Sequence, residues 1–507
     1  MMPTFELDGQ RLPFEPGDTI IQAARRAGID IPHYCWHPGL SVAANCRMCL
    51  VELVPSPGRP AVSLDVLHWD TQENRYIPSK KPKLVPACLH QVTDGLMVKS
   101  QLSEHVKRAR AAVQELLLLN HPVDCPICDQ AGECRLQDYW LEYQGTGKRM
   151  RDEIVHKPKA VTFGPTLVYD AERCIVCTRC VRLCEELAQD PVLSIRERGN
   201  LSQIVLAPGR QLDHPYSLMT EQVCPVGALT AVDFRFKARV WFLRSARTIC
   251  IGCATGCNAF LDYDPRTGQV FRHRPRENPA VNSYWMCDEG MLSYRRVHHH
   301  RCLQARANGG PVTFPEALAL AATRLKRTQR GELAVVLSAQ HSLEDNRALL
   351  EFSHERFGVA QTLIAGHPAG EGDTVLRTQG VSSLLEGLAP QSFSEFGEAV
   401  TKRQITRVLV LGGDLPDPAL LAICQRLKLL VVLASHHGPL LDRAHVVLPV
   451  STWAESEGTF VNARGMAQRS ERAIPPLGAS QPAWKVIQML AQALDADPLQ
   501  THRRGVA

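Results

Sequence analysis

The chain has 507 residues, of which 45% are apolar and 21% charged, and its formal net charge is +5. These values are typical of a soluble protein with about three to five domains. They exclude a strongly basic nucleic-acid-binding protein, and no window of about eighteen uncharged apolar residues predicts a membrane span.

Eighteen cysteines are the most unusual feature of the composition. They fall in tight groups and are not spread along the chain as in a disulfide framework. The chain begins without the basic and apolar regions of a signal peptide, so we expect a cytoplasmic protein. Grouped cysteines in a reducing compartment indicate metal ligands.

Residues 1–98 are predicted to form a small β-rich domain. Two short strands flank the turn Asp8-Gly9, a helix follows over about residues 19–27, and another strand covers residues 50–54. The segment 55–82 is rich in proline and serine, and we expect a surface insertion without chemistry there.

The cysteines of this domain have the plant-type 2Fe–2S pattern of three loop cysteines and a remote fourth: Cys35, Cys46, Cys49 and Cys88. Ten residues lie between Cys35 and Cys46, where the plant-type pattern has four. A longer loop costs little extra entropy to close, so the site tolerates it. A zinc site built from the same thiols is the alternative.

A helix is predicted from Ser103 to about Leu119. Ser103 suits the N-cap, and apolar residues recur at helical spacing at Val106, Ala109, Val113, Leu116 and Leu117. Three cysteines follow this helix, at positions 125, 128 and 134.

A cubane cluster needs four ligands, and His121 is the group nearest to Cys125, Cys128 and Cys134 that can complete the set. We expect a 4Fe–4S cluster with these four ligands. A neutral imidazole in place of a charged thiolate should by itself raise the potential of the cluster.

A second 4Fe–4S site is predicted from Cys174, Cys177 and Cys180, spaced Cys-x2-Cys-x2-Cys, with remote Cys224 before a proline. Zinc sites are the alternative, although they use two cysteine pairs. Cys184 has no partner motif nearby, and we interpret it as a small buried residue on the following helix.

A third 4Fe–4S site is predicted after a strand at 238–243. Its cysteines are spaced Cys-x2-Cys-x3-Cys with a distant fourth: Cys250, Cys253, Cys257 and Cys287. Gly252 and Gly256 let the backbone wrap closely and direct N–H groups at sulfur. The pattern resembles the cubane site that opens molybdopterin oxidoreductases, and zinc is again the alternative.

Beyond residue 306, strands at 333–337, 408–411, 429–433 and 446–448 alternate with helical stretches. This order predicts a doubly wound α/β domain with a parallel sheet. The run from Trp453 to Gln468 resembles a late motif of molybdopterin oxidoreductases, but the domain is short for a complete pterin site. We expect Cys424 to be a core thiol, residues 298–300 to be a solvated basic loop, and the domain to dock partners.

The run His121-Pro-Val-Asp-Cys125-Pro-Ile-Cys128-Asp-Gln-Ala-Gly-Glu-Cys134-Arg-Leu-Gln-Asp138 resembles the large iron–sulfur subunit of bacterial NADH–quinone oxidoreductase, respiratory complex I. The N-terminal module and residues 173–182 fit the same family in order. The resemblance implies a multidomain α/β and α+β fold. Its expected parts are a β-grasp 2Fe–2S domain (1–98), a 4Fe–4S segment with one histidine and three cysteines as ligands (99–160), a ferredoxin-like 4Fe–4S segment (161–242), a molybdopterin-oxidoreductase-type 4Fe–4S segment (243–305) and a truncated α/β domain (306–507).

The same resemblance implies an electron relay with one 2Fe–2S and three 4Fe–4S clusters and no molybdopterin. NADH and flavin would lie on a partner subunit. Electrons would enter at the 2Fe–2S site, pass the Cys174 and His121 sites, and leave toward quinone through other subunits, with the Cys250 site as a side branch. Implied partners are the NADH/FMN-binding, ferredoxin-like and quinone-module subunits, on the inner face of the cell membrane.

Two other classes remain open on the sequence. One is the iron–sulfur or catalytic subunit of an NAD-linked formate dehydrogenase or a related molybdenum enzyme. The other is a zinc-stapled scaffold without a redox role.

Overall fold

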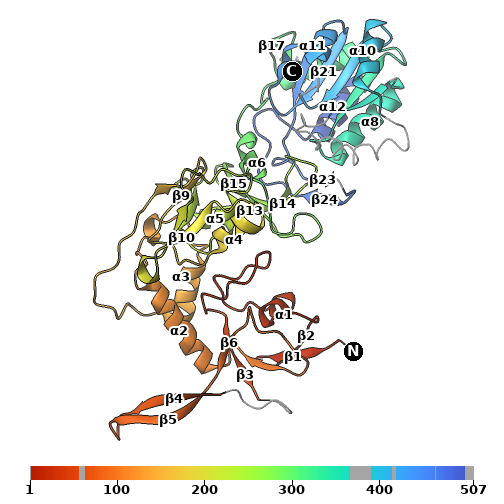
Figure 1. Ribbon diagram of the computed structural model, residues 1–507. Helices are drawn as coiled ribbons and strands as arrows, with labels where there is room; N and C mark the ends of the chain where they lie inside the picture. Colours follow the sequence, from red (N-terminus) through yellow and green to blue (C-terminus); the bar gives the residue numbers. More distant parts are fainter. Residues whose placement is uncertain are drawn as a thin grey trace, which may run out of the picture. The chain divides into compact units, whose positions relative to one another are not determined.

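The computed structural model describes residues 2–55, 63–359, 361–365, 390–413, 418–462 and 464–496. The chain divides into two compact units, Met1–Trp241 and Phe242–Ala507, which run from red to yellow and from yellow-green to blue in Figure 1. Within the described ranges, no helix is both long and apolar enough to cross a membrane.

A five-stranded mixed sheet with the order β2-β1-β7-β3-β6 opens the first unit. Asp8 and Gly9, with φ of 50° and 83°, form the turn between its first two strands. Helix α1 (Ile20–Arg26) buries its apolar side chains in the core of this sheet and begins at a capping box formed by Thr19 and Gln22. The strands are β1 (Thr4–Leu7), β2 (Gln10–Pro13), β3 (Leu50–Val54), β6 (Leu84–Pro86) and β7 (Met97–Lys99). The expected turn, helix and third strand are confirmed.

The expected surface insertion contains a separate hairpin of β4 (Ser63–Asp70) and β5 (Arg75–Pro82). Figure 1 shows it projecting from the sheet, and Leu67 and Tyr76 on it are exposed. Residues 56–62 of that insertion lie outside the described residues.

Helix α2 (Glu104–Leu118) begins as expected, with the Ser103 hydroxyl accepting a hydrogen bond from Val106 N at 3.2 Å. The expected apolar face is only partly the buried one, because Leu116 is 69% exposed while Arg110 and Gln114 are fully buried. Both buried polar side chains form hydrogen bonds: Arg110 donates to Ser100 Oγ at 2.7 Å, and Gln114 donates to Leu136 O at 2.8 Å, although Arg110 Nε has no partner among the described residues. Hydrogen bonding therefore overrides the apolar pattern along this helix.

The rest of the first unit consists of short elements joined by loops, so its cysteines lie on turns and helix ends. It contains the three-stranded sheet β12-β9-β8 and the two-stranded hairpin β10-β11. The elements are α3 (Arg135–Tyr139), a π-helical turn (Trp140–Gln144), β8 (Val161–Thr162), β9 (Leu167–Tyr169), α4 (Arg179–Glu186), β10 (Leu193–Arg196), β11 (Gln203–Leu206), α5 (Met219–Val223), β12 (Leu229–Ala231), and 3-10 turns at Cys125–Ile127, Gly199–Leu201 and Val240–Phe242.

The strand predicted at 238–243 is wrong. Residues Val240–Phe242 form a 3-10 turn, and the strand β13 begins only at Arg244. The aromatic side chains that suggested a strand are half-exposed and lie under guanidinium groups: Arg239 over Trp241 at 5.5 Å and Arg266 over Phe242 at 5.0 Å.

The second unit starts with an antiparallel sheet, β13-β14-β15, followed by α6 (Asp288–Leu292) and a 3-10 turn at Ser293–Val297. Its strands are β13 (Arg244–Ile249), β14 (Asn258–Tyr263) and β15 (Val270–Pro275). A small hairpin near the end of the chain, β23 (Gly458–Val461) and β24 (Ala467–Ser470), contacts β13.

The remainder of the second unit is a seven-stranded sheet with the order β17-β16-β22-β21-β20-β18-β19. The five strands from β18 to β22 run parallel, as predicted, and the short β16 and β17 add an antiparallel edge. The strands are β16 (Arg306–Ala307), β17 (Gly310–Pro311), β18 (Leu333–Ser338), β19 (Gln361–Ala365), β20 (Arg407–Leu411), β21 (Leu429–Ala434) and β22 (Val446–Pro449).

Helices cover both faces of this sheet, which makes the domain doubly wound (Figure 1). One apolar core joins the sheet to α7 (Phe314–Leu325), α8 (Leu343–Phe357) and α12 (Ala483–Asp495). The other joins it to α10 (Phe393–Thr401) and α11 (Pro418–Cys424), and a further 3-10 turn covers Pro439–Asp442. Cys424 lies in the second core, 2% exposed, so its prediction as a core thiol is confirmed.

Candidate metal centres

The four cysteines predicted to bind the 2Fe–2S cluster lie on a loop, just before strand β3 and on a turn after β6 of the N-terminal sheet. Cys35 N donates to Cys46 Sγ at 3.5 Å, so the long loop closes on itself. The Cys49 thiol donates to Cys88 and thereby lowers the pKa of Cys88, while Cys35 and Cys46 act against this shift. All four sulfurs therefore share one site, and three of the four cysteines are buried.

The group around His121 is assembled from the end of α2, a 3-10 turn and the start of α3. Burial raises the pKa of the Cys134 thiol to about 11, and Cys128 and Cys125 add to this shift, so the three thiols are neighbours. His121 Nδ1 is buried without a hydrogen-bond partner in the described part of the chain. No hydrogen bond among the described residues joins the His121 ring to a thiol.

The protonation state of His121 suits a metal ligand. Burial in the first place, and then the positive charge of Arg173, lower its pKa to about 4, with Asp124 opposing. The imidazole is therefore neutral at pH 7, which is the form that binds metals.

The second set of thiols joins two segments that are far apart in the sequence. Cys174 and Cys177 lie on the loop before α4, Cys180 lies on that helix, and Cys224 directly follows α5. Burial raises the pKa of Cys180, and Cys177, Cys174 and Cys224 all contribute. Val176 and Thr178 have φ of 51° and 63°, and this left-handed backbone lets the loop wrap around one point.

Cys184 lies on α4 and is fully buried, as predicted. Its Sγ is 3.4 Å from His214 Nε2. The remaining thiol outside the four sets, Cys302, is also fully buried.

The third set of thiols, in the second unit, is also brought together. Burial raises the pKa of Cys257, and Cys250, Cys253 and Cys287 add to this shift. Gly252 N donates to Cys250 Sγ at 3.4 Å, as expected. Gly256 differs from the expectation, because its N–H donates to Cys253 O at 3.3 Å and not to sulfur; its φ of 60° serves the turn.

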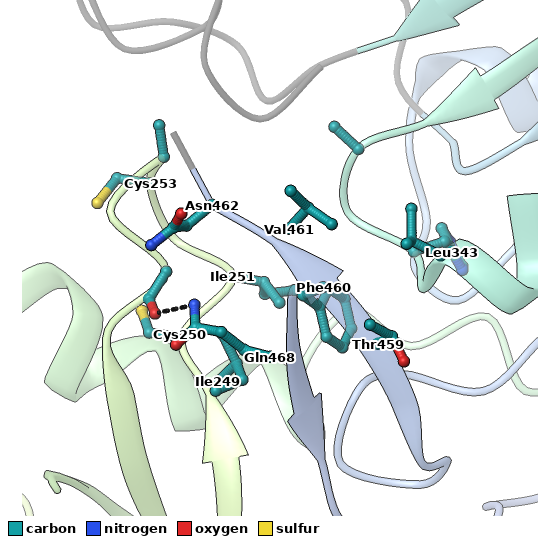
Figure 2. A pocket seen from close by; sticks show the side chains of 14 residues that line it. Ile249, Cys250, Ile251, Cys253, Leu343, Thr459, Phe460, Val461, Asn462 and Gln468 are labelled. Carbon is teal, nitrogen blue, oxygen red and sulfur yellow. Dashed lines mark hydrogen bonds between the residues drawn. The ribbon is translucent and has the colours of Figure 1, made fainter. Parts of the chain in front are cut away.

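The late motif packs against this third set, which the sequence did not predict. Figure 2 shows a hollow between the Cys250 loop and the strand β23, which carries Phe460 and is followed directly by Asn462. Gln468 Nε2 donates to Gly256 O at 2.9 Å and its Oε1 accepts from Asn258 Nδ2. Gln468 therefore anchors the cysteine loop, and its distance in sequence hid this role.

The donor sets fit iron–sulfur clusters, which take thiolate ligands. Glycines leave room beside the sulfurs: a β-carbon at Gly290 would lie 3.2 Å from Cys250 Sγ, and one at Gly227 would lie 2.2 Å from Cys128 Sγ. Among the described residues, no three or more His, Cys, Asp or Glu side chains are grouped closely enough to hold a single metal ion.

Four family models match the chain. They are a 2Fe–2S iron–sulfur cluster binding domain (residues 2–103), the NADH-ubiquinone oxidoreductase-G iron–sulfur binding region (110–149), the NADH-quinone oxidoreductase subunit 3 ferredoxin-like domain (164–230) and molybdopterin oxidoreductase (377–493). Together they define an iron–sulfur-binding protein with several domains.

Curated relatives are more specific. The G subunit of NADH-quinone oxidoreductase from Streptomyces coelicolor is 34% identical over 69% of this chain and 39% of the relative, and that from Rickettsia felis is 33% identical over 68% and 47%. The mitochondrial NADH-ubiquinone oxidoreductase 78 kDa subunit of Candida albicans is 36% identical over 66% and 43%. The chain is similar to the G subunits of NADH-quinone oxidoreductase, and the matched region spans less than half the length of these relatives.

Among solved structures, one chain of an NAD+-reducing NiFe hydrogenase in the H2-reduced state is 29% identical, with 47% of this chain and 92% of that chain covered and a TM-score of 0.38. A superposition this loose carries no argument about the fold.

Proposed function

We propose that the chain is the electron-transfer subunit of an NADH–quinone oxidoreductase and relays electrons from an NADH- and flavin-binding partner toward quinone. The observation that carries the proposal is the assembly of the second thiol set, where Cys224 joins Cys174, Cys177 and Cys180 across the first unit. The names of the relatives supply the complex in which such a relay would work.

The ligand assignment is part of the same proposal. The 2Fe–2S ligands would be Cys35, Cys46, Cys49 and Cys88. The three 4Fe–4S clusters would be held by His121 with Cys125, Cys128 and Cys134; by Cys174, Cys177, Cys180 and Cys224; and by Cys250, Cys253, Cys257 and Cys287. Bound clusters of this kind supply one-electron redox chemistry.

The protein's own residues hold and tune these sites. Backbone N–H groups of Gly252 and Gly290 donate to Cys250 and Cys287 at 3.4 Å each, which stabilises negative charge on sulfur. Burial raises the pKa of the Cys177 thiol to about 11, with Arg179 and Arg182 acting against this shift. The two guanidinium groups therefore favour the thiolate that iron requires.

We further propose that the five sequence ranges given above are the domains, with a β-grasp fold for residues 1–98. The partners would be the NADH/FMN-binding, ferredoxin-like and quinone-module subunits, and the protein would lie on the inner face of the membrane through them.

We expect no molybdopterin in this chain. The hollow at the carboxyl ends of the parallel strands is lined by two carboxylates, Asp345 and Glu457, and by one guanidinium, that of Arg296. Such a lining does not match the phosphate groups of a pterin dinucleotide, because the carboxylates repel them.

The test is metal and acid-labile sulfide analysis of protein purified anaerobically, together with low-temperature EPR of the reduced protein. One 2Fe–2S and three 4Fe–4S signals, with iron and sulfide in equal amounts, are expected. A colourless, folded protein containing zinc and no sulfide would show a scaffold, and stoichiometric molybdenum would show the formate dehydrogenase class.

A further inference from the structure

The long loop between the first two cysteines of the 2Fe–2S set is held on the segment that carries the second thiol set. Ser41 donates from its backbone N, at 2.9 Å, and from its hydroxyl to the carboxylate of Glu186, at the end of α4. Asn45 Nδ2 donates to Val176 O at 3.3 Å, between Cys174 and Cys177. The loop therefore contacts both the cysteine loop and the helix of the second set.

Arg182 lies at the centre of this contact and is 8% exposed. Its Nη2 donates to Cys35 O at 2.6 Å and to Cys177 O at 3.3 Å, and its Nη1 donates to Ser41 O. One planar guanidinium group thus joins the backbone carbonyls of a ligand from each of two sets. Only arginine offers donors in this fork geometry.

Arg179, one turn earlier on α4, adds a second bond between the segments. Its Nη1 donates to Val223 O at 3.0 Å, next to Cys224, and its Nη2 donates to Trp36 O, next to Cys35. Its Nε is buried without a partner, and no carboxylate in the described part of the chain forms an ion pair with Arg179 or Arg182.

Two buried cations without carboxylate partners need negative charge nearby. Burial lowers the pKa of Arg179, and Cys177, Cys224 and Cys35, which come from both sets, act against this shift. The hydrogen bonds of Arg182 and Arg179 to both segments favour the docked arrangement of the two sets.

We propose that Arg182, supported by Arg179, is the positioning residue that docks residues 36–45 on the loop of residues 174–178 and fixes the separation of the two cysteine sets. The long gap between Cys35 and Cys46 is then a docking element and not merely a tolerated insertion. The consequence for electron transfer rests on the proposed function, whereas the docking itself does not.

The test uses the full chain, purified anaerobically, with Arg182→Gln and Arg182→Lys. The control is Arg210→Gln, because the Arg210 side chain is 52% exposed and forms its ion pair with Asp190 away from both sets. We expect the amide hydrogens of residues 36–46 to exchange about tenfold faster in Arg182→Gln, since two charged hydrogen bonds are lost. Arg182→Lys keeps the positive charge but lacks the paired guanidinium donors, so residues 36–46 should exchange at a rate between those of the wild type and Arg182→Gln.

A second readout is spectroscopic. In the wild-type chain, reduction of the second set should speed the spin relaxation of the 2Fe–2S EPR signal, and Arg182→Gln should weaken this effect while iron content is retained. The proposal would be overturned if the amide exchange rates and the spin relaxation rate of Arg182→Gln both stayed within about twofold of the wild-type values, as those of Arg210→Gln should.

If Arg182→Gln does not fold, Glu186→Ala decides. Glu186 is exposed and, within the described part of the chain, its carboxylate is hydrogen-bonded to Ser41 alone, so its removal should release Ser41. Faster exchange of residues 40–46 in Glu186→Ala, but not in the neighbouring control Glu185→Ala, supports docking, and unchanged exchange refutes it. A wild-type chain that shows loop protection but no cluster signals would instead refute the proposed function alone.

Discussion

Gly227 is in such close contact with Cys128 that a β-carbon at position 227 would lie 2.2 Å from the sulfur. Gly227 ends the turn that carries Cys224, so a turn of the second thiol set packs on a thiol of the His121 set. Arg173 strengthens this contact, because it precedes Cys174 and donates to Asp124 at 2.9 Å. The His121 set and the second thiol set are thereby held side by side within the first unit.

Gly227→Ala should therefore disturb the His121 site more than the site of the second thiol set, although Gly227 lies on the turn that carries Cys224. Real β-carbons essentially never lie within 3.0 Å of another heavy atom, and a thiol held in the proposed cluster would have no freedom to move away. We expect loss or a strong shift of one 4Fe–4S EPR signal, with the 2Fe–2S signal retained. Gly147→Ala is the control, since its β-carbon would meet nothing within 4 Å. A wild-type spectrum for Gly227→Ala would contradict the packing.

His121 offers a test of ligand identity. His121→Ala should remove one 4Fe–4S signal, because we propose the neutral, buried imidazole as the fourth donor of its set. His121→Cys should keep the cluster but lower its potential, since a charged thiolate stabilises the oxidised form. His156→Ala is the control, because that ring is 76% exposed and bonded to Glu172. Retention of all three 4Fe–4S signals in His121→Ala would remove His121 from the ligand set.

Much of the framework was predictable because its causes are local. The turn at Asp8, the cap at Ser103 and the parallel strands of residues 333–448 follow from turn chemistry, capping and apolar runs. The grouping of the thiols follows from ligand spacing, although their role as ligands stays a prediction. These features need no information from distant parts of the chain.

The rest depended on contacts between distant segments. The buried face of α2 is polar because Gln114 meets Tyr34 and Leu136, and no periodicity reveals those partners. The docking of Arg182 on Cys35 and the anchoring of the Cys250 loop by Gln468 also join residues far apart in the sequence. A single sequence can mark the residues of such a contact, but it does not show that the two ends meet.

The buried ion pair of Arg301 and Glu455 joins the segment that follows the Cys250 thiol set to the late motif in the second unit. The two side chains are 2% and 0% exposed and form two bonds, at 2.9 and 2.7 Å. Glu455→Gln should cost about 3–5 kcal/mol, since it leaves a buried charge unpaired. Hydrogen exchange of β22 and residues 451–455 measures this loss.

The matched control for that pair is Glu457→Gln. Its partner is Arg469, at 2.8 Å, but both side chains are more than two thirds exposed. The exposed pair should contribute less than about 1 kcal/mol. If Glu455→Gln and Glu457→Gln lowered the free energy of unfolding equally, burial of the Arg301–Glu455 pair would not govern its contribution to stability.

Asp18 should make the N-terminal domain sensitive to acid. The Arg26 guanidinium bonds both carboxylate oxygens, at 2.6 and 2.9 Å, and this interaction lowers the pKa of Asp18 below its usual 3.8. A folded-state pKa below the unfolded value gives stability that is present above about pH 4 and is lost as the pH falls through the folded pKa. Asp18→Asn should therefore be less stable at pH 7, by about 1 kcal/mol after allowance for the half-exposed arginine.

The difference between the two proteins should shrink below about pH 4, as the wild-type carboxylate takes up its proton. Urea titrations of wild type and variant at a series of pH values measure this difference, and acid effects on the thiol sites cancel because both proteins share them. Glu73→Gln is the control, since the Glu73–Arg75 pair is exposed on the hairpin. A difference for Asp18→Asn that stays constant down to about pH 3 would mean that the Asp18–Arg26 pair does not set the acid sensitivity of this domain.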